Sequence, residues 1–432
     1  MGSLKKSSHR KVFSKQKIRV INLGCARNLA DAGTLAGILK KRGHRLVDSD
    51  KSDAVILNTC CFIEDAKKET IDAILDLLEL KNKGHIKRLV VAGCFPERYR
   101  SEILKEFKGV DAYIGAIKLT EDSFSRQIPL TPSHFAYLKI CESCYNLCRF
   151  CIIPSIKGKF ISRTEDSILD EVKRLDAQGV KELNIIGQDI TAYGMDLYQE
   201  KRLAKLLKKI CSASKNIRWI RLLYTFPAHV TDELIDVIAQ EPKICKYIDI
   251  PLQHIHDTIL TQMNRRTTKK ETVQLIKDIR NKIPQARLRT TFIVGLPGET
   301  EEIFEDLVAF VKEMRFEKLG VFKYSREEGT PAYDMPGQVD EAVKEERYNR
   351  LMKVQQAISE DIQRQFVGKT LDVLIDEKLK EEKNDYLGRT PYDAPDVDGV
   401  VYVHAKKKLK PGDIVKVRIT DSLEYDLAGE TL

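Results

Sequence analysis

The stretch FAYLKICESCYNLCRFC, residues 135–151, joins an apolar run to three closely spaced cysteines. The run FAYLKI predicts a buried β-strand. Cys144, Cys148 and Cys151 follow it, and soft thiolates gathered in this way are typical of a metal site. A structural zinc would need a fourth ligand from elsewhere in the chain. A four-iron, four-sulfur cluster held by only these three thiolates would keep one iron open to a further ligand.

The residues after this stretch alternate between strand-like and helix-like patterns. Further apolar runs predict strands at residues 182–188, 217–224, 246–252, 288–295 and 319–325. Amphipathic segments between them predict helices at residues 165–178, 201–214, 231–240, 268–283 and 300–316. Thr268 and Glu271 fit a capping box, and Thr300 fits an N-cap. Repeated strand–helix units predict an α/β fold with a parallel sheet, either a partial barrel or a doubly wound sheet.

Several residues directly follow these strands and are candidates for binding a small molecule. The second strand runs into Gly187, Gln188 and Asp189, and the fifth ends at Gly295 in the sequence VGLPGET. Active sites in such folds lie at the carboxyl ends of the strands. Glycine there lets the backbone approach a ligand closely. We therefore expect these residues to lie at the same sheet edge as the three cysteines.

An earlier strand–helix series, from residue 17, carries a second set of cysteines. Strands are predicted at residues 17–25, 53–62, 87–95 and 110–115, which implies a doubly wound parallel sheet. The first three end in Cys25, in Cys60 or its neighbour Cys61, and in Cys94. Because the carboxyl ends of parallel strands meet at one edge, these thiols should converge on one crevice. The alternative is three buried cysteines with no common ligand.

Composition and charge limit the remaining function classes. The chain has no apolar run long enough for a transmembrane helix and no apolar core of a secretory signal. Its ten cysteines are therefore expected in a reducing compartment, the cytoplasm. Seven Lys or Arg and no acid among the first 19 residues supply most of the formal net charge of +9, and this basic tail is predicted to be disordered over residues 1–16. Such a tail can bind phosphate backbones or can simply be solvated.

The spacing of Cys144, Cys148 and Cys151, with Phe150 before the last cysteine, resembles the signature of the radical S-adenosylmethionine (SAM) superfamily. The resemblance implies that these thiolates hold a [4Fe-4S] cluster whose open iron binds SAM. Phe150, Gly187, Gln188, Asp189 and Gly295 are then the expected cofactor-binding residues. No side chain is expected to be catalytic itself, because the cluster and SAM carry the chemistry.

The whole chain from residue 17 is similar to the methylthiotransferase family. The sequences LGCARN, NTCCF and AGCF match its second three-cysteine set, and NTC selects Cys60 over Cys61 as ligand alongside Cys25 and Cys94. The resemblance implies an amino-terminal domain over residues 17–130, a radical SAM partial (βα)6 barrel over 131–365 and a small antiparallel β-barrel, the TRAM domain, over 366–432. Ser143 departs from the family's usual glycine, and Ala32-Gly33 departs from its usual Ser-Glu.

The family replaces an unactivated C–H bond by C–S–CH3, and the resemblance implies two [4Fe-4S] clusters for this work. One SAM would be cleaved to a radical that removes the hydrogen. The second cluster would carry the sulfur, which another SAM methylates. An electron donor such as flavodoxin or ferredoxin is the further partner implied.

Two substrate classes are known in the family, and three features favour the protein-modifying class. That class acts on the β-carbon of an aspartate of small-subunit ribosomal protein twelve; the other acts on a tRNA adenosine beside the anticodon. CIIPSIKGK (151–159) and GRTPYDAPDVDG (388–399) resemble the protein-modifying class. Residues 368–432 hold eleven Lys or Arg and fourteen Asp or Glu. This acidic domain should suit a basic protein better than tRNA, with Asp393, Asp396 and Asp398 as its docking charges.

Several other residues are weaker candidates for a functional role. His254 and His256 are expected in loop structure or SAM-site packing, with acid–base catalysis as the alternative. Cys141, Cys211 and Cys245 are expected to be buried thiols. Two other classes compete with this reading. A non-enzymatic iron–sulfur RNA-binding protein predicts no SAM binding, and a different sulfur-inserting radical enzyme with an auxiliary cluster would not explain the TRAM-like residues 366–432.

Overall fold

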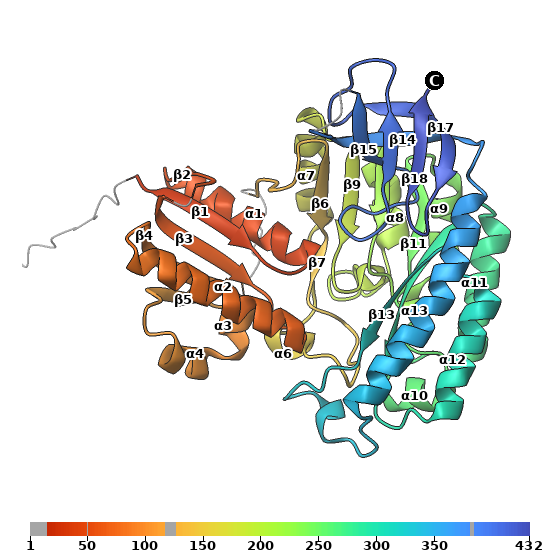
Figure 1. Ribbon diagram of the computed structural model, residues 1–432, viewed down its shortest axis with the longest axis horizontal. Coiled ribbons are helices and arrows are strands. Elements are labelled where there is room, and N and C mark those ends of the chain that lie inside the picture. Colours follow the sequence, from red (N-terminus) through yellow and green to blue (C-terminus); the bar gives the residue numbers. More distant parts are fainter. Residues whose placement is uncertain (1–14, 50, 117–126, 381–383) are drawn as a thin grey trace, which may run out of the picture. The chain divides into compact units, whose positions relative to one another are not determined.

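The apolar runs before the two cysteine sets become strands of two separate parallel sheets (Figure 1). The computed structural model describes residues 15–49, 51–116, 127–380 and 384–432. The predicted disordered tail at 1–16 lies almost wholly outside the described residues. The chain divides into two compact units, the first formed mainly by the residues before 117 and the second by those from 129 onward.

The first unit is a doubly wound sheet, as predicted. Its parallel strands run in the order β2-β1-β3-β4-β5. Their bounds are β1 Lys17–Asn22, β2 Arg45–Leu46, β3 Ser52–Thr59, β4 Ile86–Gly93 and β5 Ala112–Ile114. The helices are α1 Ala26–Lys41, α2 Glu64–Asn82, α3 Cys94–Arg98 and α4 Arg100–Glu106. The strand order reverses between β1 and β3, and ligands bind at such a switch point in open α/β sheets.

The larger sheet, in the second unit, is the predicted partial barrel. Each strand pairs in parallel with the next large strand along the chain, in the order β6-β9-β10-β11-β12-β13. Because every connection is a right-handed crossover and the strand order always advances the same way, the helices lie on one face of the sheet. The sheet therefore curves into a partial barrel. The strands are β6 Phe135–Lys139, β9 Glu182–Ile186, β10 Trp219–Leu222, β11 Ile244–Asp249, β12 Arg287–Val294 and β13 Lys318–Lys323, with a small ribbon of β7 Cys141–Glu142 and β8 Ile161–Ser162.

Two helices of this unit begin where the sequence predicts caps. Thr268 and Glu271 form the expected capping box, and the Thr300 side chain accepts from the Ile303 amide. The helices are α6 Ile153–Lys157, α7 Glu165–Ala177, α8 Leu203–Ala213, α9 Asp232–Gln240, α10 Asp257–Gln262, α11 Lys269–Lys282, α12 Glu301–Met314 and α13 Glu341–Arg364. Apolar residues of the strands and helices, and of α13, pack into one extended core.

The carboxyl-terminal strands close into the predicted small barrel, in the order β14-β15-β16-β18-β17; its pairs are antiparallel as predicted, except that β16 pairs with β18 in parallel. They are β14 Thr370–Lys378, β15 Asp385–Arg389, β16 Val401–His404, β17 Ile414–Ser422 and β18 Leu427–Thr431. The segment 388–399, here called the signature loop, leaves this barrel and packs against the amino-terminal ends of the large parallel strands. Arg389 pairs with Glu182 at the start of β9 at 2.7 Å, and Asp393 pairs with Lys318 at the start of β13 at 2.7 Å.

This arrangement corrects the expected role of the signature-loop aspartates. Asp393 is 6% exposed, and the Asp398 carboxylate accepts a 2.7 Å hydrogen bond from Tyr247. Asp396 alone of the three is classed as exposed, and it accepts from Tyr137 at 3.3 Å. Asp393 and Asp398 are therefore held inside the molecule and are not available to dock a substrate.

The ion pairs of the carboxyl-terminal barrel also weaken the inference that its acidic charge selects a basic protein as substrate. Within residues 368–432, Asp376, Asp393, Asp398 and Arg389 all lie in internal ion pairs. Setting these four aside leaves eleven acidic and ten basic residues of the original fourteen and eleven. The remaining charges of this segment of the sequence are thus nearly balanced, because Asp393 and Asp398 pair with Lys318 and Arg289 of the partial barrel.

Candidate functional site

The three cysteines of the opening stretch lie in the loop after β6, at the carboxyl edge of the large sheet. Ser143 begins this loop with φ 63°, a left-handed conformation that favours glycine. Its hydroxyl donates to Gly158 O at 2.6 Å, which explains how serine replaces the usual glycine here. Cys144 and Cys151 are half-buried and Cys148 is buried. The thiols therefore sit at the edge of the core and are shielded from most of the solvent.

Nitrogen donors surround the sulfur atoms of this loop. The backbone amide of Asn146 lies 3.4 Å from Cys144 Sγ, and its side-chain Nδ2 lies 3.7 Å from the same atom. Arg265 Nη1 lies 3.4 Å from Cys148 Sγ. Hydrogen bonds of this kind stabilise a sulfur atom that carries negative charge, as a metal-bound thiolate does.

Asp189 connects the cysteine loop to the neighbouring strands. Its carboxylate, 1% exposed, accepts from Asn146 Nδ2 at 2.7 Å and from the Thr191 amide at 2.9 Å, and His229 Nδ1 lies 2.8 Å from it. Gln188 Nε2 donates to Glu142 Oε1 at 3.1 Å. The structure therefore brings Gln188 and Asp189 to the cysteine loop, and it adds His229, which the sequence analysis did not single out.

The glycines of the strand ends have steric reasons to be glycine. A Cβ at Gly187 would lie 2.4 Å from Cys141 Sγ. Gly295 has φ 74°, and a Cβ there would lie 2.2 Å from the Lys344 side chain. Phe150 packs with Leu296, the residue after Gly295, in a small apolar cluster. Gly187, Gly295 and Phe150 are thus set by packing within the chain, and their contact with a cofactor stays a prediction.

His254 takes part in loop structure. It is 1% exposed, its Nδ1 accepts from the His256 amide at 3.0 Å, and its Nε2 lies 3.4 Å from Glu299 Oε2. Glu299 is itself paired with Arg347 at 2.9 Å. Accepting on Nδ1 leaves Nε2 to carry the proton of the neutral ring.

Charge and burial act differently on two groups of this site. Burial, with the negative charge of Asp189, raises the pKa of the Cys144 thiol to about 11. Burial also opposes ionisation of Glu142, but Lys139 and Lys157 outweigh it and lower the pKa of Glu142 to about 2. Glu142 is therefore a fixed anion, whereas the Cys144 thiol must lose its proton when it binds a metal.

The second cysteine set lies at the switch point of the first unit. Cys25 follows β1, Cys60 follows β3 and Cys94 follows β4. Gly24, with φ 87°, brings two of these loops together, because a Cβ there would lie 2.7 Å from the Cβ and 3.2 Å from the Sγ of Cys60. Asn28 donates to Thr59 O at 3.1 Å, and its Oδ1 lies 3.9 Å from Cys94 Sγ. Asn28 Nδ2 also donates to Leu23 O at 3.1 Å, so one buried asparagine contacts the loops of all three cysteines.

An arginine also lies beside a sulfur atom of the second cysteine set. Arg27 Nε lies 3.3 Å from Cys25 Sγ. Burial opposes ionisation of Cys25, but the charge and hydrogen bond of Arg27 outweigh it and hold the pKa of this thiol below its ordinary value. The thiolate form that binds metal therefore appears at a lower pH at Cys25 than at an ordinary cysteine.

The structure also explains why Ala32-Gly33 stands where the family usually has Ser-Glu. A Cβ at Gly33 would lie 2.4 Å from the backbone oxygen of Ile128, and the Ile128 amide donates to Gly33 O at 3.2 Å. Ala32 is fully buried. A glutamate at position 33 would not fit while the chain passes so close to α1.

Comparison with known families divides the chain as the two sheets and the barrel do. Residues 17–115 match the family described as Uncharacterized protein family UPF0004, residues 138–311 match the Radical SAM superfamily and residues 367–432 match the TRAM domain.

Full-length relatives decide the family. The chain is 47% identical to the ribosomal protein uS12 methylthiotransferase RimO of Thermoanaerobacter sp. (strain X514), over 96% of this chain and 100% of the relative. It is 44% identical to RimO of Clostridioides difficile (strain 630), over 96% and 99%, respectively. The chain belongs to the RimO family. The match to RimO of Geobacter sulfurreducens, 43% over 97% of this chain and 99% of the relative, agrees.

Solved structures support the fold of this RimO family member. The radical SAM methyltransferase TsrM from Kitasatospora setae superimposes with a TM-score of 0.53 at 13% identity, covering 83% of this chain and 80% of TsrM. The cobalamin-dependent radical SAM enzyme OxsB gives a TM-score of 0.52 at 12% identity, covering 80% of this chain and 56% of OxsB. At such low identity the likeness concerns the fold alone.

The residues present fit the cofactors that the radical SAM superfamily implies, a [4Fe-4S] cluster and SAM. Thiols are the ligands that iron–sulfur clusters use, and N–H donors reach the sulfurs of Cys144 and Cys148. Within the described ranges, no three His, Cys, Asp or Glu side chains lie close enough to share one metal ion. The assignment of the ligands therefore rests on the thiols' shared sheet edge and their donors. Buried atoms that lack a partner, such as Gln188 Oε1 and Gln253 Oε1, lie in this part of the chain and are free to bind a ligand.

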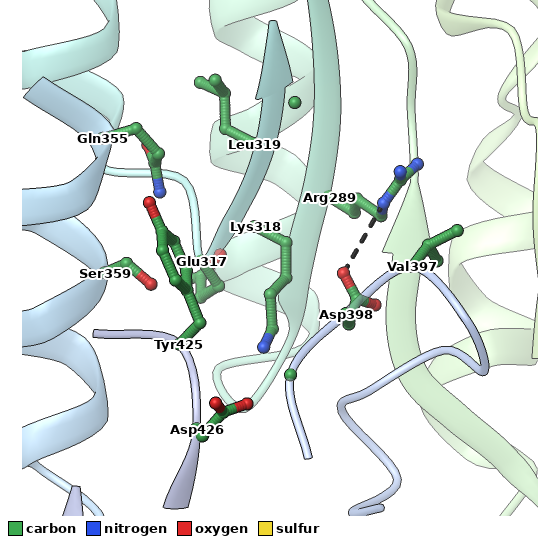
Figure 2. A pocket seen from close by; sticks show the side chains of 12 residues that line it. Arg289, Glu317, Lys318, Leu319, Gln355, Ser359, Val397, Asp398, Tyr425 and Asp426 are labelled. Carbon is green, nitrogen blue, oxygen red and sulfur yellow. Dashed lines mark ion pairs between the residues drawn. The ribbon is translucent and has the colours of Figure 1, made fainter. Parts of the chain in front are cut away.

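The cavity in Figure 2 lies elsewhere in the second unit. It has a volume of about 320 Å³ and is lined by residues that include Arg289, Lys318, Asp398 and Tyr425. Arg289 and Lys318 stand at the starts of β12 and β13, so this cavity is at the opposite end of the strands from Cys144. None of the described helices has the length and apolar character needed to cross a membrane.

Proposed function

We propose that this chain is a radical SAM methylthiotransferase that acts on ribosomal protein uS12 in the cytoplasm and holds two [4Fe-4S] clusters. The ligands would be Cys144, Cys148 and Cys151 for the cluster that binds SAM, and Cys25, Cys60 and Cys94 for the auxiliary cluster. The target would be the β-carbon of an aspartate, and a flavodoxin or ferredoxin would supply electrons.

The observation that supports this proposal is that three cysteines follow strand ends at the carboxyl edge of each of two parallel sheets. Three thiolates leave one iron of each cluster open. When bound, the cofactors supply the radical that breaks the C–H bond and the sulfur and methyl group that replace the hydrogen. The full-length relationship to RimO proteins indicates the substrate, since those relatives are named for uS12.

The chain's own residues then bind and orient. Asn146 and Arg265 donate to ligand sulfurs, while Asp189 fixes Asn146. Gly295 lets the β12 end pass close to Lys344, and its amide donates to Glu299 at 3.0 Å. Glu142 keeps a negative charge beside Lys139 at every pH near neutrality. Hydrogen bonds and ion pairs within the chain fix these groups, and such fixed groups limit reorganisation during a reaction.

Iron content tests the two-cluster proposal. Full-length protein reconstituted without oxygen should contain about eight iron atoms per chain, since each cluster holds four. Replacing Cys144, Cys148 and Cys151 with alanine should leave about half of this iron. The Cys25, Cys60 and Cys94 alanine variant should also keep about half, and it should still cleave SAM while forming no methylthio product. A triple variant that retained all its iron would refute the ligand assignment.

Mass spectrometry tests the substrate. In a strain that lacks this gene, uS12 should lose one methylthio group, and the gene should restore it. Bulk tRNA should be unchanged in the same strains. Loss of a methylthio-adenosine from tRNA with uS12 unaffected would replace the ribosomal-protein assignment by the tRNA alternative. Absence of SAM cleavage would favour the iron–sulfur RNA-binding class instead.

A further inference from the structure

Arg265 is a buried cation directly beside the cysteine loop of the second unit. It is 4% exposed, and its Nη2 donates to Pro251 O at 2.6 Å. Its Nη1 lies 3.4 Å from Cys148 Sγ, and its guanidinium carbon stands 4.2 Å from the centre of the Phe226 ring. The guanidinium is therefore enclosed by a carbonyl, an aromatic face and one sulfur atom.

What distinguishes Arg265 from the other buried arginines is its lack of a carboxylate. Throughout the described ranges, each of the other buried arginines pairs with a glutamate or an aspartate. These are Arg163 with Glu171, Arg221 with Glu182, Arg347 with Glu299, and Arg389 with Glu182 and Asp376. No carboxylate in the same ranges pairs with Arg265, and its Nε has no hydrogen-bond partner.

A buried guanidinium with only neutral partners is unfavourable, because the low-dielectric interior strengthens the field of an uncompensated charge. Among these contacts of Arg265, the sulfur of Cys148 is the group that can become negative. As a thiol it supplies no charge, but as a ligand of an anionic cluster it would. The missing counter-charge of Arg265 thus points to the metal-bound state of Cys148.

The backbone around Arg265 fixes this contact. Asn264 Nδ2 donates to Leu147 O at 2.8 Å, and the Arg149 amide donates to Met263 O at 3.1 Å. Met263 and Asn264 are therefore hydrogen-bonded to the cysteine loop on both sides of Cys148. The position of the guanidinium against the sulfur is set by these bonds as well as by its own.

We propose that Arg265 is a positioning residue that donates a charge-assisted hydrogen bond to the Cys148 sulfur and thereby raises the reduction potential of the SAM-binding cluster. The inference rests on the proposed function, because it requires a cluster on Cys144, Cys148 and Cys151. Reduction adds one electron to an anionic cluster, and a nearby positive charge with an N–H donor stabilises the more negative state. Hydrogen bonds to sulfur are among the factors that set cluster potentials.

The experiment uses the full chain carrying the Cys25, Cys60 and Cys94 alanine substitutions, so that only the cluster of interest remains. Arg265→Met is compared with Arg266→Met, which removes the same charge from the adjacent, exposed position. Iron is counted first, and the cluster is then titrated with dithionite and mediators, without SAM, by electron paramagnetic resonance. We expect Arg265→Met to lower the ratio of reduced to oxidised cluster at a fixed potential at least tenfold, or about 59 mV for one electron. Arg266→Met should leave the ratio unchanged.

The outcomes separate the inference from the proposed function. Absence of iron in the parent with an intact Arg265 would refute the proposed cluster itself. Iron retained in Arg265→Met with an unchanged potential would refute the role of Arg265, including the case in which only SAM affinity changed. If Arg265→Met lost its iron, Arg265→Gln would be titrated instead. This variant keeps an N–H donor without the charge, and an unchanged potential would likewise overturn the proposal.

Discussion

Asp393 and Asp372 are both aspartates of the carboxyl-terminal barrel region that pair with a lysine, but their surroundings differ. The Asp393–Lys318 pair, at 2.7 Å, has side-chain exposures of 8% and 11%. The Asp372–Lys416 pair, at 2.9 Å, has exposures of 45% and 60%. Removing one member of a buried pair leaves an uncompensated charge, whereas an exposed pair contributes little.

We therefore expect Asp393→Asn to lower the free energy of unfolding by about 3–5 kcal/mol, because it leaves Lys318 unpaired. Asp372→Asn, the matched control, should change it by at most about 1 kcal/mol. Urea unfolding of the two variants measures both. Equal effects would show that the signature loop does not hold Asp393 in the interior.

The same aspartate predicts a pH dependence. Burial opposes ionisation of Asp393, but Lys318 and the Thr390 hydroxyl outweigh it, so its pKa lies below the ordinary value. A carboxyl with a lowered folded pKa stabilises the fold above its unfolded pKa, about 3.9, and this stabilisation is lost as the pH falls through the folded pKa. The difference in stability between the native chain and Asp393→Asn should thus be constant from pH 7 to 5 and shrink below about pH 4. A difference that already shrinks near pH 6 would contradict a lowered pKa.

At the scale of elements, the signature loop depends on a close backbone contact. A Cβ at Gly399 would lie 2.0 Å from the backbone oxygen of Tyr425, in the turn between β17 and β18. The Val400 amide donates to Asp426 Oδ1 at 2.8 Å in the same place. Gly399 thus lets the loop end against this turn, so that Asp398 reaches Arg289 and Tyr247.

Gly399→Ala should destabilise the protein by about 1–3 kcal/mol, since the turn must move to admit a methyl group. Gly320→Ala in β13 is the control, because its nearest atom would be 4.0 Å from the added Cβ. Its effect should stay within about 0.5 kcal/mol. Thermal or urea unfolding compares them. A well-tolerated Gly399→Ala would mean that the loop can shift without losing its ion pairs.

These elements also show what the sequence could and could not predict. Strand and helix periodicity placed Cys144, Gln188 and Asp189 at one sheet edge, because that inference needs only the period of each segment and the direction of the strands. The burial of Asp393 was missed because its partner, Lys318, lies 75 residues away and nothing local distinguishes the two from surface charges. Arg265 was missed for the same reason, since its neighbour Cys148 is 117 residues away.

At the scale of the whole molecule, the partial barrel and the TRAM barrel belong to one compact unit and share buried ion pairs. Glu182 pairs with Arg221 of the partial barrel and Arg389 of the TRAM barrel, and His134 lies 2.8 Å from Asp376. Without the TRAM barrel, Lys318 would lose its aspartate and Glu182 one of its two arginines. The first unit has its own sheet and needs none of these pairs.

A chain truncated after Phe366 should therefore be less stable in the partial barrel, whereas the first unit should keep its stability. Hydrogen-exchange mass spectrometry should find faster exchange in β9, β10 and β12, which carry Glu182, Arg221 and Arg289. Exchange in β1, β3 and β4 should match that of the full chain, because local stability follows local contacts. The strands of the first unit thus serve as an internal control in the same sample. Unchanged protection of β9 and β10 would show that the signature loop is an attachment to a barrel already complete without it. Faster exchange in both sheets would show instead that the two units fold as one.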